Sequence, residues 1–341
     1  MKVIHLLPAL EQGGVETVVC DLVRELGIGD QVSGIRWESV VVSRGGRMVG
    51  RIEAAGGRHI ALDLKSKNPL TYFTRAWKLR RILRAEKPDL VCVHSRVPAW
   101  LFVWANRGLG LKWITYAHGA NSVSRYSEVM TKGNLVITPS RFLADYLKAN
   151  YGTPEEKIRV IPNAVDAKRF DPENLDRAFI TEKRREWGIR EGDHVMMAIG
   201  RITPVKGLDN LIRTTPSDVK LVIVGGADRH HQKYLDSLKA LAGSNVIFAG
   251  PQEKISECIS IADEIVSANT TKPETFGLSV IEAYAMNKPV RAKRFGGVAE
   301  VMEAVEKAGK PTLREAVKAL YSFEFQRERT IVAYREALDM V

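Results

Sequence analysis

The chain has few cysteines and lacks any long apolar run. Its 341 residues include three cysteines, which stand far apart and form no CxxC pair: Cys20, Cys92 and Cys258. This usage excludes a disulfide framework and favours a reducing compartment. The longest apolar run, VPAWLFVWA at residues 97–105, has nine residues, whereas a membrane-spanning helix needs about 20. The opening segment MKVIHLLPALEQGG has too short an apolar run for a secretory signal and no small-residue cleavage site, so we expect a cytoplasmic protein without a membrane span.

Positive charge is in excess and unevenly distributed. Lysine and arginine total 51 against 40 acidic residues, a net charge of +11. Residues 1–165 hold 24 basic and 14 acidic residues, whereas the remainder holds 27 and 26. We therefore expect the N-terminal half to face an anionic partner. A basic nucleic-acid-binding protein is an alternative. Apart from residues 65–87, however, the sequence shows no aromatic-rich RNA platform and no basic recognition helix, and we expect no nucleic-acid partner.

Short apolar runs alternate with amphipathic segments along the whole chain. In the first half, VIHLLPAL, SVVVS, PDLVCVH, KWITYAH and NLVITPS predict strands, and in the second half HVMMAIG, VKLVIVGG, NVIFAG, EIVSAN and PVRAKRF do. Strands separated by helices imply right-handed βαβ units and parallel sheets. The series restarts after Pro162–Asp171. We predict an α/β protein with two doubly wound, Rossmann-like domains facing a cleft, over residues 1–165 and 166–320, and a final helix over 321–341 that packs back across the junction.

Two loops that follow predicted strands carry candidate phosphate-binding groups, because ligands of open parallel sheets lie beyond the carboxyl ends of the strands. EQGGVE places Gly13 and Gly14 before a helix, where backbone N–H groups can approach a phosphate. GRITPVKG holds Arg201 and Lys206 five residues apart, so both cations can reach one diphosphate. Taken alone, the first loop is a weak signal, because most Gly-Gly turns are ordinary turns and this one is not GxGxxG. The second loop is equally typical of a solvated basic loop.

A third loop, KPETFGLSVIEA, is more specific. Glu274 precedes a predicted helix, and Glu282 lies eight residues further on. The turn between them presents N–H groups at a helix N-terminus, where an anion is favoured. Each carboxylate can accept hydrogen bonds from vicinal hydroxyls, as the acidic residue of dinucleotide-binding folds does from a ribose. The alternative is that both glutamates are ordinary solvent-exposed surface residues. The apolar neighbours of Glu282 in IEAYA argue against this alternative for Glu282.

Together these motifs resemble glycosyltransferase family 4, the retaining enzymes of GT-B fold. GGVE, YAHG, IRVIPNAVDAKRF, GRITPVKG, VIVGG, PETFGLSVIEAYAMNKPV and FGGVAEV occur in the family's order over nearly the whole chain, and PETFGLSVIEA is the most specific. The resemblance implies that Glu282 binds the nucleotide ribose and Glu274 the transferred sugar. It implies that His118 of YAHG hydrogen bonds near the reacting centre, with a satisfied buried histidine as the alternative. The other implied donor-binding residues are Gly13, Gly14, Arg201, Lys206, Gln252, Phe276, Gly277 and Leu278.

Two features depart from the family's usual pattern. After FGGVAE the chain runs almost directly into a helix, which shortens the predicted C-terminal domain. Arg291, Lys293 and Arg294 stand where the family often has apolar or small residues, consistent with a charged substrate or with a solvated edge.

There is no DxD motif and no Cys/His cluster, so we expect no metal. Arg201, Lys206 and a helix N-terminus would then neutralise the diphosphate.

The implied reaction is the retaining transfer of a hexose-type sugar from a UDP- or GDP-linked donor. The implied acceptor is a hydroxyl of a lipid-linked molecule, a lipopolysaccharide or another cell-envelope polysaccharide. His94 and Arg96 in VCVHSR are candidates for the acceptor side. A nucleotide-sugar epimerase of the same fold is the alternative enzyme, and it would need acid–base carboxylates and a histidine around the sugar ring.

One basic segment suits an anionic membrane surface. Residues 65–87 contain eight lysines and arginines and a single acid, Glu86. A helix from about residue 70 would turn an aliphatic stripe to the core and leave outside it Phe73, Trp77, Arg80, Arg81 and Arg84. Aromatic rings interleaved with arginines suit a lipid headgroup layer, and a solvated helix is the alternative. We therefore expect a peripheral protein at the inner face of the cytoplasmic membrane.

Overall fold

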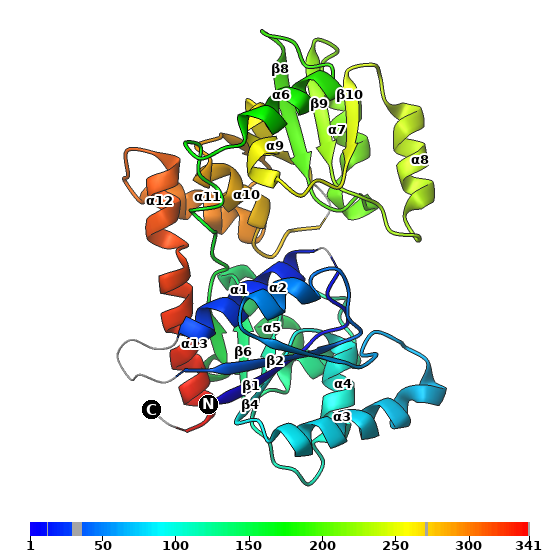
Figure 1. Ribbon diagram of the computed structural model, residues 1–341, viewed down its shortest axis with the longest axis vertical. Coiled ribbons are helices and arrows are strands. Elements are labelled where there is room, and N and C mark those ends of the chain that lie inside the picture. Colours follow the sequence, from blue (N-terminus) through cyan, green and yellow to red (C-terminus); the bar gives the residue numbers. More distant parts are fainter. Residues whose placement is uncertain (12, 29–35, 270–271, 340–341) are drawn as a thin grey trace. The chain divides into compact units, whose positions relative to one another are not determined.

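The structure, a computed structural model, describes residues 1–11, 13–28, 36–269 and 272–339 (Figure 1). The chain divides into two compact units. The first comprises Met1–Asn163 and the C-terminal segment from Phe323 onward, and the second comprises Ala164–Ser322. The sequence-based boundaries were placed at residues 165/166 and 320/321.

The described residues of the first unit form a seven-stranded parallel sheet in the order β3-β2-β1-β4-β5-β6-β7. The strands are β1 (Lys2–Leu6), β2 (Glu38–Ser43), β3 (Arg58–Ala61), β4 (Leu90–Val93), β5 (Trp113–Tyr116), β6 (Leu135–Thr138) and β7 (Ile158–Val160). The strand order reverses between β1 and β4, so the sheet is doubly wound and its switch point lies there. β3 and β7 were not among the predicted strands. Both are short edge strands with partly exposed residues, so neither shows the continuous apolar run of a central parallel strand.

Helices cover both faces of this sheet, because successive side chains of a strand point to opposite faces. Ile4 and Leu6 pack toward α3 and α4, whereas Leu7 and Val41 pack toward α1 and α2 (Figure 1). The helices of this unit are α1 (Gly14–Ile28), α2 (Val49–Ala54), α3 (Tyr72–Glu86), α4 (Arg96–Ala105), α5 (Arg141–Tyr151) and α13 (Phe323–Ala337), with short 3-10 turns η1 (Pro69–Thr71), η2 (Ser127–Thr131) and η3 (Glu155–Lys157).

The last helix, α13, is part of the core of the first unit. Arg327 forms a 3.0 Å ion pair with Glu25 of α1, and both side chains are nearly buried. The Tyr334 hydroxyl lies 3.0 Å from that of Tyr116 on β5. Removing one partner of a buried ion pair leaves an uncompensated charge, at a cost of about 3–5 kcal/mol, so substitution of either Arg327 or Glu25 alone should destabilise this unit.

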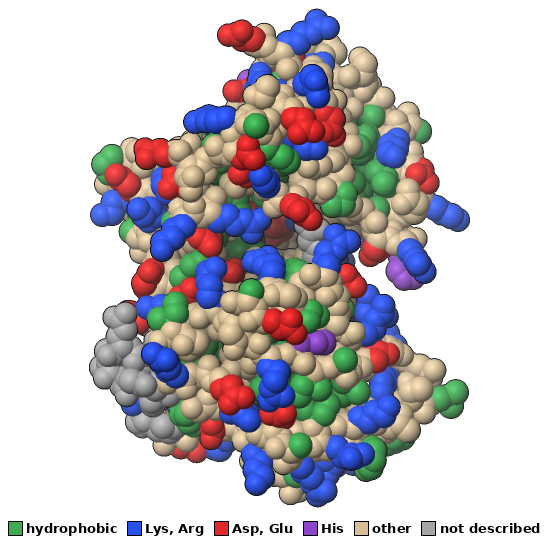
Figure 2. All heavy atoms as spheres, in the orientation of Figure 1, with side chains coloured by type: hydrophobic (Ala, Val, Ile, Leu, Met, Phe, Trp, Pro, Cys, Tyr) green, Lys and Arg blue, Asp and Glu red, His purple; other side chains and the backbone are tan. Residues whose placement is uncertain are grey.

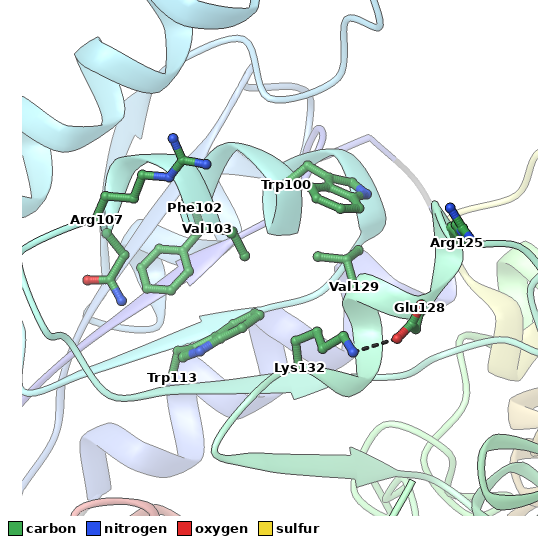
Figure 3. A pocket seen from close by; sticks show the side chains of 10 residues that line it. Trp100, Phe102, Val103, Arg107, Trp113, Arg125, Glu128, Val129 and Lys132 are labelled. Carbon is green, nitrogen blue, oxygen red and sulfur yellow. Dashed lines mark hydrogen bonds and ion pairs between the residues drawn. The ribbon is translucent and has the colours of Figure 1, made fainter. Parts of the chain in front are cut away.

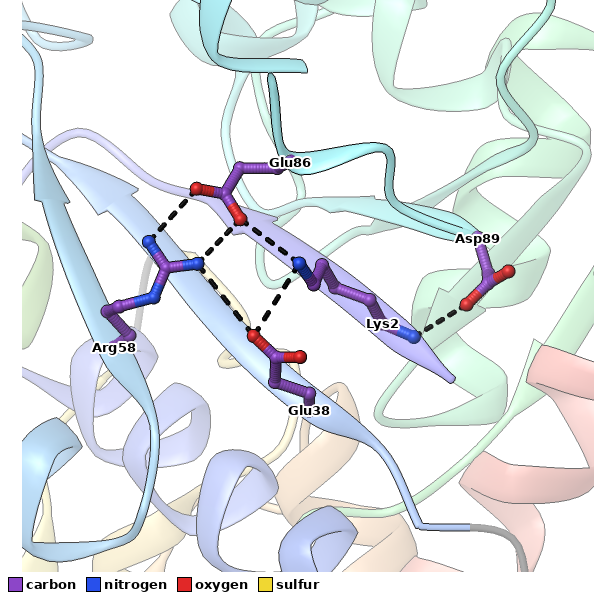
Figure 4. A network of polar contacts seen from close by, with 5 residues as sticks. All are labelled: Lys2, Glu38, Arg58, Glu86 and Asp89. Carbon is purple, nitrogen blue, oxygen red and sulfur yellow. Dashed lines mark hydrogen bonds and ion pairs between the residues drawn. The ribbon is translucent and has the colours of Figure 1, made fainter. Parts of the chain in front are cut away.

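A charged network ties the end of α3 to the amino ends of the strands (Figure 4). The Glu86 carboxylate receives hydrogen bonds from Arg58 of β3 and from Lys2 of β1. The hydrogen bond from Arg58 is the largest cause that lowers the pKa of Glu86, and Lys2 adds to it. Glu86, the only acid of residues 65–87, is therefore paired with basic residues at the amino ends of β1 and β3. It does not neutralise the outer face of α3.

The described residues of the second unit form a five-stranded parallel sheet in the order β10-β9-β8-β11-β12. The strands, all predicted, are β8 (His194–Ile199), β9 (Val219–Val224), β10 (Val246–Gly250), β11 (Glu264–Ser267) and β12 (Val290–Ala292). Its helices are α6 (Arg177–Glu186), α7 (Leu208–Thr214), α8 (Gln232–Leu241), α9 (Ile255–Ile261), α10 (Leu278–Ala285), α11 (Gly297–Lys307) and α12 (Leu313–Leu320), with the 3-10 turn η4 (Pro204–Lys206). The switch point of this sheet lies between β8 and β11, where ligands of doubly wound folds bind.

The charged edge at β12 is largely ion-paired. Arg291 pairs with Glu264 of β11 at 2.6 Å, and Arg294 pairs with Glu306 of α11. Both pairs involve an exposed arginine, which suits the solvated-edge interpretation of this stretch.

In the part of the chain that the structure describes, no helix has the length and apolar character to cross a membrane.

Candidate functional site

The loops after β8 and β11 meet beside the switch point of the second unit. Lys206 forms an ion pair with Glu274, which joins the two loops. Arg201, in the same loop as Lys206, is exposed and has no ion pair with any described residue. A cavity of about 20 Å³ lies between these loops and is lined by Arg201, Lys206 and Glu274 among others. Two cations and a carboxylate predicted from separate motifs therefore lie together at one point of the sheet.

Asn269 lines the same cavity, and sequence reasoning missed it. It follows β11, its side chain is almost buried, and its Oδ1 atom has no hydrogen-bond partner among the described residues. A buried amide oxygen without a partner is unfavourable unless a ligand or water satisfies it. The signal in the sequence was a polar residue at the exit of a predicted strand, in EIVSAN.

Glycines hold the backbone around Glu274. The Gly297 N–H donates a 2.8 Å hydrogen bond to the Glu274 carbonyl, and a side-chain carbon on Gly297 would overlap the carbonyl oxygen of Thr275. This close approach explains the two glycines of FGGVAEV. Gly277, with φ +94°, precedes α10, and none of the described side chains caps the N-terminus of that helix. The Val280 N–H already donates to the Gly277 carbonyl at 3.0 Å, which leaves the N–H groups of Leu278 and Ser279 for another acceptor.

The other predicted donor-binding residues of this unit lie apart from the cavity lining. Glu282 is half-buried on α10. The Phe276 ring is buried against Tyr321 in an edge contact with 5.6 Å between centroids, so only its backbone is available to a ligand. The Gln252 side chain donates a 2.6 Å hydrogen bond to the Ala249 carbonyl, so it shapes the loop after β10.

In the first unit, the glycine pair lies at the start of α1. The helix begins at Gly14, and the Thr17 N–H donates to the Gly13 carbonyl at 3.0 Å. A Cβ atom on Gly13 would lie 2.5 Å from a carboxylate oxygen of Glu16. The acidic side chain therefore covers Gly13, and it already complements the positive end of the helix dipole.

Three histidines form a row across the switch point of the first unit. His94 Nδ1 lies 3.0 Å from His118 Nε2, and His94 Nε2 lies 3.1 Å from His5 Nδ1. His5 lies on β1, His94 follows β4, and His118 follows β5. Burial lowers the pKa of His5 to about 3 and that of His118 to about 4. The pKa of His94 lies well below its usual range, chiefly because of burial and also because of the neighbouring histidines. All three rings are therefore neutral at pH 7.

The predicted acceptor residues His94 and Arg96 make different contacts. His94 is 3% exposed, and both of its ring nitrogens face other histidines. The Arg96 guanidinium donates a 3.1 Å hydrogen bond to Ser127 and lies over the Tyr126 ring. His5, which sequence reasoning missed, was visible only as a lone histidine within an apolar strand.

The outer face of α3 carries exposed aromatic side chains. Phe73 is 62% and Trp77 is 51% exposed, and the Arg81 guanidinium lies 5.0 Å from the Trp77 ring centroid. Figure 2 shows lysine and arginine side chains along the part of this face that α3 occupies in Figure 1. Arg80 departs from the prediction, because its guanidinium donates hydrogen bonds of 2.7 and 2.6 Å to the carbonyls of Ala105 and Arg107. It caps the end of α4, whereas Arg81 and Arg84 stay exposed.

A groove of about 470 Å³ runs between α4, the start of β5 and η2 (Figure 3). Its walls include Trp100, Phe102 and Trp113, and the Glu128–Lys132 ion pair lies on one side. The groove contains none of the residues predicted from the sequence.

Among the described residues, no group of three or more histidine, cysteine or acidic side chains is arranged to hold a metal ion.

Both units match known glycosyltransferase domains. Residues 12–169 match the family described as Glycosyltransferase Family 4, and residues 179–318 match Glycosyl transferases group 1. The chain belongs to the family 4 glycosyltransferases. This confirms the predicted family, and the two doubly wound units confirm the predicted GT-B fold.

This glycosyltransferase aligns with only part of the length of its curated relatives. An uncharacterised glycosyltransferase of Methanocaldococcus jannaschii is 31% identical over 49% of the chain and 44% of its own length. The lipopolysaccharide 1,2-N-acetylglucosaminetransferase of Salmonella typhimurium is 26% identical over 68% of the chain and 62% of its own length. The chain thus matches less than two thirds of the length of these relatives.

Solved structures share the fold over the whole chain. HepE from Anabaena, crystallised with UDP and glucose, superposes with a TM-score of 0.80 and 18% identity, covering 100% of both chains. At this identity the likeness establishes the fold, and the chemistry has to be argued from the residues of this glycosyltransferase.

Proposed function

We propose that this glycosyltransferase transfers a hexose-type sugar, with retention of configuration, from a nucleotide-diphosphate sugar to a hydroxyl of a lipid-linked or polysaccharide acceptor. The main support for the proposal is that Arg201, Lys206 and Glu274 lie together at the switch point of the second unit. The two cations on one loop can bind a diphosphate, and the carboxylate can accept hydrogen bonds from sugar hydroxyls. The nucleotide and sugar bound by HepE support this donor class.

The proposed reaction needs stabilisation of a departing diphosphate. Arg201, Lys206 and the uncapped N-terminus of α10 would supply fixed positive charge and dipoles where negative charge develops. The acceptor oxygen bonds to the anomeric carbon on the face from which the diphosphate leaves, the bond from that carbon to the diphosphate oxygen breaks, and a departing phosphate oxygen takes the acceptor proton. No metal is assigned a role.

The carboxylates and His118 are proposed to hold the sugar and the ribose. Glu274 would accept hydrogen bonds from hydroxyls of the transferred sugar, and Glu282 from the ribose hydroxyls. His118 would hydrogen bond to the transferred sugar as a neutral ring, consistent with the burial that lowers its pKa to about 4. Asn269, whose buried amide oxygen has no partner among the described residues, is added as a further acceptor for a donor hydroxyl.

The acceptor is proposed to be an amphipathic, membrane-associated molecule. The relative from Salmonella, named as a lipopolysaccharide N-acetylglucosaminetransferase, supports this class. The exposed Phe73 and Trp77, with Arg81 and Arg84 on the same face of α3, suit the interface of an anionic bilayer. We propose that this face attaches the enzyme peripherally to the cytoplasmic side of the membrane.

The donor assignment is tested by thermal unfolding with UDP-, GDP- and ADP-glucose, each with EDTA and with Mg²⁺. A ligand at about 100 times its Kd adds about 2.7 kcal/mol to the stability of the folded state. We expect one nucleotide sugar to raise the Tm equally in EDTA and in Mg²⁺. Failure of all three donors, or a rise that requires Mg²⁺, would contradict the proposal. Lys206→Met should abolish the rise, whereas Lys233→Met, which removes an exposed charge from α8 of the same unit, should leave it intact.

A further inference from the structure

The groove between α4, the start of β5 and η2 combines apolar walls with two cations. Its volume of about 470 Å³ lies within the range of small-molecule sites, roughly 300–1,000 Å³. The walls include Trp100, Phe102 and Trp113, and Figure 3 shows Arg107 and Arg125 at opposite ends of the groove. Both arginines are exposed, and neither guanidinium forms a hydrogen bond or an ion pair with any described residue. An apolar groove with unpaired cations suits an anionic amphiphile.

Most other polar side chains of the groove are already bonded within the protein. The Asn106 amide exchanges two hydrogen bonds of 3.0 Å with the backbone of Leu111. The indole N–H of Trp100 donates to a backbone carbonyl just before η2, and Glu128 pairs with Lys132. A sugar ring in the groove would leave hydroxyls without partners, which is unfavourable, whereas a hydrocarbon chain has no polar groups to satisfy. The groove therefore suits a hydrocarbon chain better than a glycan.

The two ends of the groove have different neighbours. The Arg107 carbonyl accepts a 2.6 Å hydrogen bond from Arg80 of α3, and the exposed Phe73 ring of α3 contacts Trp104 of α4 with 5.8 Å between centroids. Arg125 lies in the loop that follows the carboxyl end of β5, and ligands of open parallel sheets bind at that edge. The groove thus runs from α3 to the ligand-binding edge of the first unit.

Exposed apolar side chains gather on the same part of the first unit. Ten large apolar side chains are exposed among the described residues, and five of these belong to the short stretch from η1 to η2: Leu70, Phe73, Trp77, Val123 and Tyr126. A chain that leaves the groove beside α3 would therefore meet apolar side chains as well as water. Such a concentration marks a surface for an apolar partner.

We propose that this groove binds a lipid phosphate, with the phosphate at Arg125 and the hydrocarbon chain lying along Trp100 and Trp113 toward α3. A guanidinium can hold a phosphate through two parallel N–H groups. This occupant narrows the acceptor of the proposed function to a molecule linked to a lipid phosphate, and it rests on that function for the reaction. A sugar attached to the phosphate would lie at the ligand-binding edge, while the chain would extend toward the outer face of α3.

Titration calorimetry with decyl phosphate, kept below the concentration at which it forms micelles, tests this site without a donor or a membrane. We expect the protein to bind decyl phosphate at least about tenfold more tightly than butyl phosphate, because the longer chain buries more apolar area. Arg125→Gln should weaken binding about tenfold, the loss expected for one charge-assisted hydrogen bond. The matched control, Arg51→Gln, removes an exposed charge from α2 of the same unit and should leave binding unchanged.

Three results would overturn the proposal. Equal affinities for decyl and butyl phosphate would show that the chain is not bound. Loss of binding in Arg107→Gln but not in Arg125→Gln would place the phosphate at the wrong end of the groove. Displacement of decyl phosphate by cellohexaose would assign the groove to a glycan.

Methyl NMR of protein with ¹³C-labelled valine locates the chain directly. Val103 lines the groove, whereas Val332 on α13 is 50% exposed and lies outside it. We expect nuclear Overhauser contacts from decyl phosphate to the Val103 methyl groups and none to Val332. The reverse pattern would show adsorption to any exposed apolar side chain and would refute the site. Because no nucleotide sugar is present, a protein that binds decyl phosphate here but binds no nucleotide sugar would refute the proposed function and keep the groove assignment.

Discussion

Lys206 and Glu274 form an ion pair that joins the loop after β8 to the loop after β11. Both side chains are partly exposed, at 28% and 17%. The pair places the proposed diphosphate cation against the proposed sugar-binding carboxylate. Donor binding would then exchange partners, so that the diphosphate neutralises Lys206 and sugar hydroxyls bond to Glu274.

This exchange predicts that two neutralising substitutions have opposite effects on the binding of a nucleoside diphosphate. The ligand to use is UDP, or the nucleoside diphosphate of whichever nucleotide sugar raises the Tm. Lys206→Met should weaken binding by about tenfold or more, because a charge-assisted hydrogen bond contributes roughly 1.5–3 kcal/mol. Glu274→Gln should leave it unchanged or tighten it, because Lys206 loses its competing partner, while sugar transfer falls. Isothermal titration calorimetry measures both. Weaker nucleoside-diphosphate binding in Glu274→Gln would show that the pair does not compete with the diphosphate.

A backbone substitution behind Glu274 should also abolish donor binding. In Gly297→Ala, the new side chain overlaps the Thr275 carbonyl, so the loop that carries Glu274 has to move. We expect a loss of stability of roughly 1–3 kcal/mol, typical of forced packing, and loss of the thermal shift with nucleotide sugar. The matched control is Gly50→Ala within α2, where a Cβ meets nothing within 4 Å and should stabilise the helix by about 0.5–1 kcal/mol. Normal donor binding by Gly297→Ala would contradict the role given to the FGG turn.

The exposed face of α3 predicts binding to anionic vesicles. Sedimentation with vesicles containing phosphatidylglycerol should show binding that weakens with salt, because exposed charges are screened. Trp77→Ser with Arg81→Glu and Arg84→Glu should reduce binding more than tenfold, since each basic residue near the surface contributes about 1 kcal/mol. Arg80 is left unchanged because it caps α4.

The control for this prediction places the same charge change on the second unit. Arg213→Glu with Lys233→Glu alters two exposed residues of α7 and α8. If this control loses vesicle binding as strongly as the α3 variant, net charge and not the α3 face accounts for attachment. Equal binding of the α3 variant and the wild type would remove the membrane proposal.

The histidine row predicts a loss of stability in mild acid. The folded-state pKa values of His5 and His118 are lowered to about 3 and about 4, below the usual 6.5. Between these values and 6.5 the unfolded chain binds protons that the folded chain does not, so the stability is full above pH 6.5 and falls as the pH drops. Each such histidine contributes roughly 1.4 kcal/mol per pH unit in that window.

Urea unfolding between pH 7 and pH 4.5 measures this dependence. His5→Asn removes one titrating group and should give a shallower fall in the free energy of unfolding. His230→Gln, at an exposed position of the second unit, should keep the wild-type slope. A wild-type slope in folded His5→Asn would mean that His5 does not titrate below its usual range.

Local sequence was enough to predict much of this fold. Central parallel strands are buried on both faces and therefore read as apolar runs, so all five strands of the second unit and five of the seven described strands of the first were predicted. The edge strands β3 and β7 were missed because each is short and partly exposed. The motif loops were predicted correctly as the exits of strands, which is why Arg201, Lys206 and Glu274 could be named before their positions were known.

By itself, the sequence determined the family, the doubly wound pattern and the residue types at the switch point of the second unit, because periodicity and motifs are carried by neighbouring residues. Only the tertiary structure decided which of these side chains meet. Lys206 and Glu274 are 68 residues apart in the chain, and His5 and His94 are 89 apart. Likewise, Arg80 looked like a surface cation until α4 placed two carbonyls beside it. Contacts of this kind arise when sheet order brings distant strand ends together, and no local pattern encodes them.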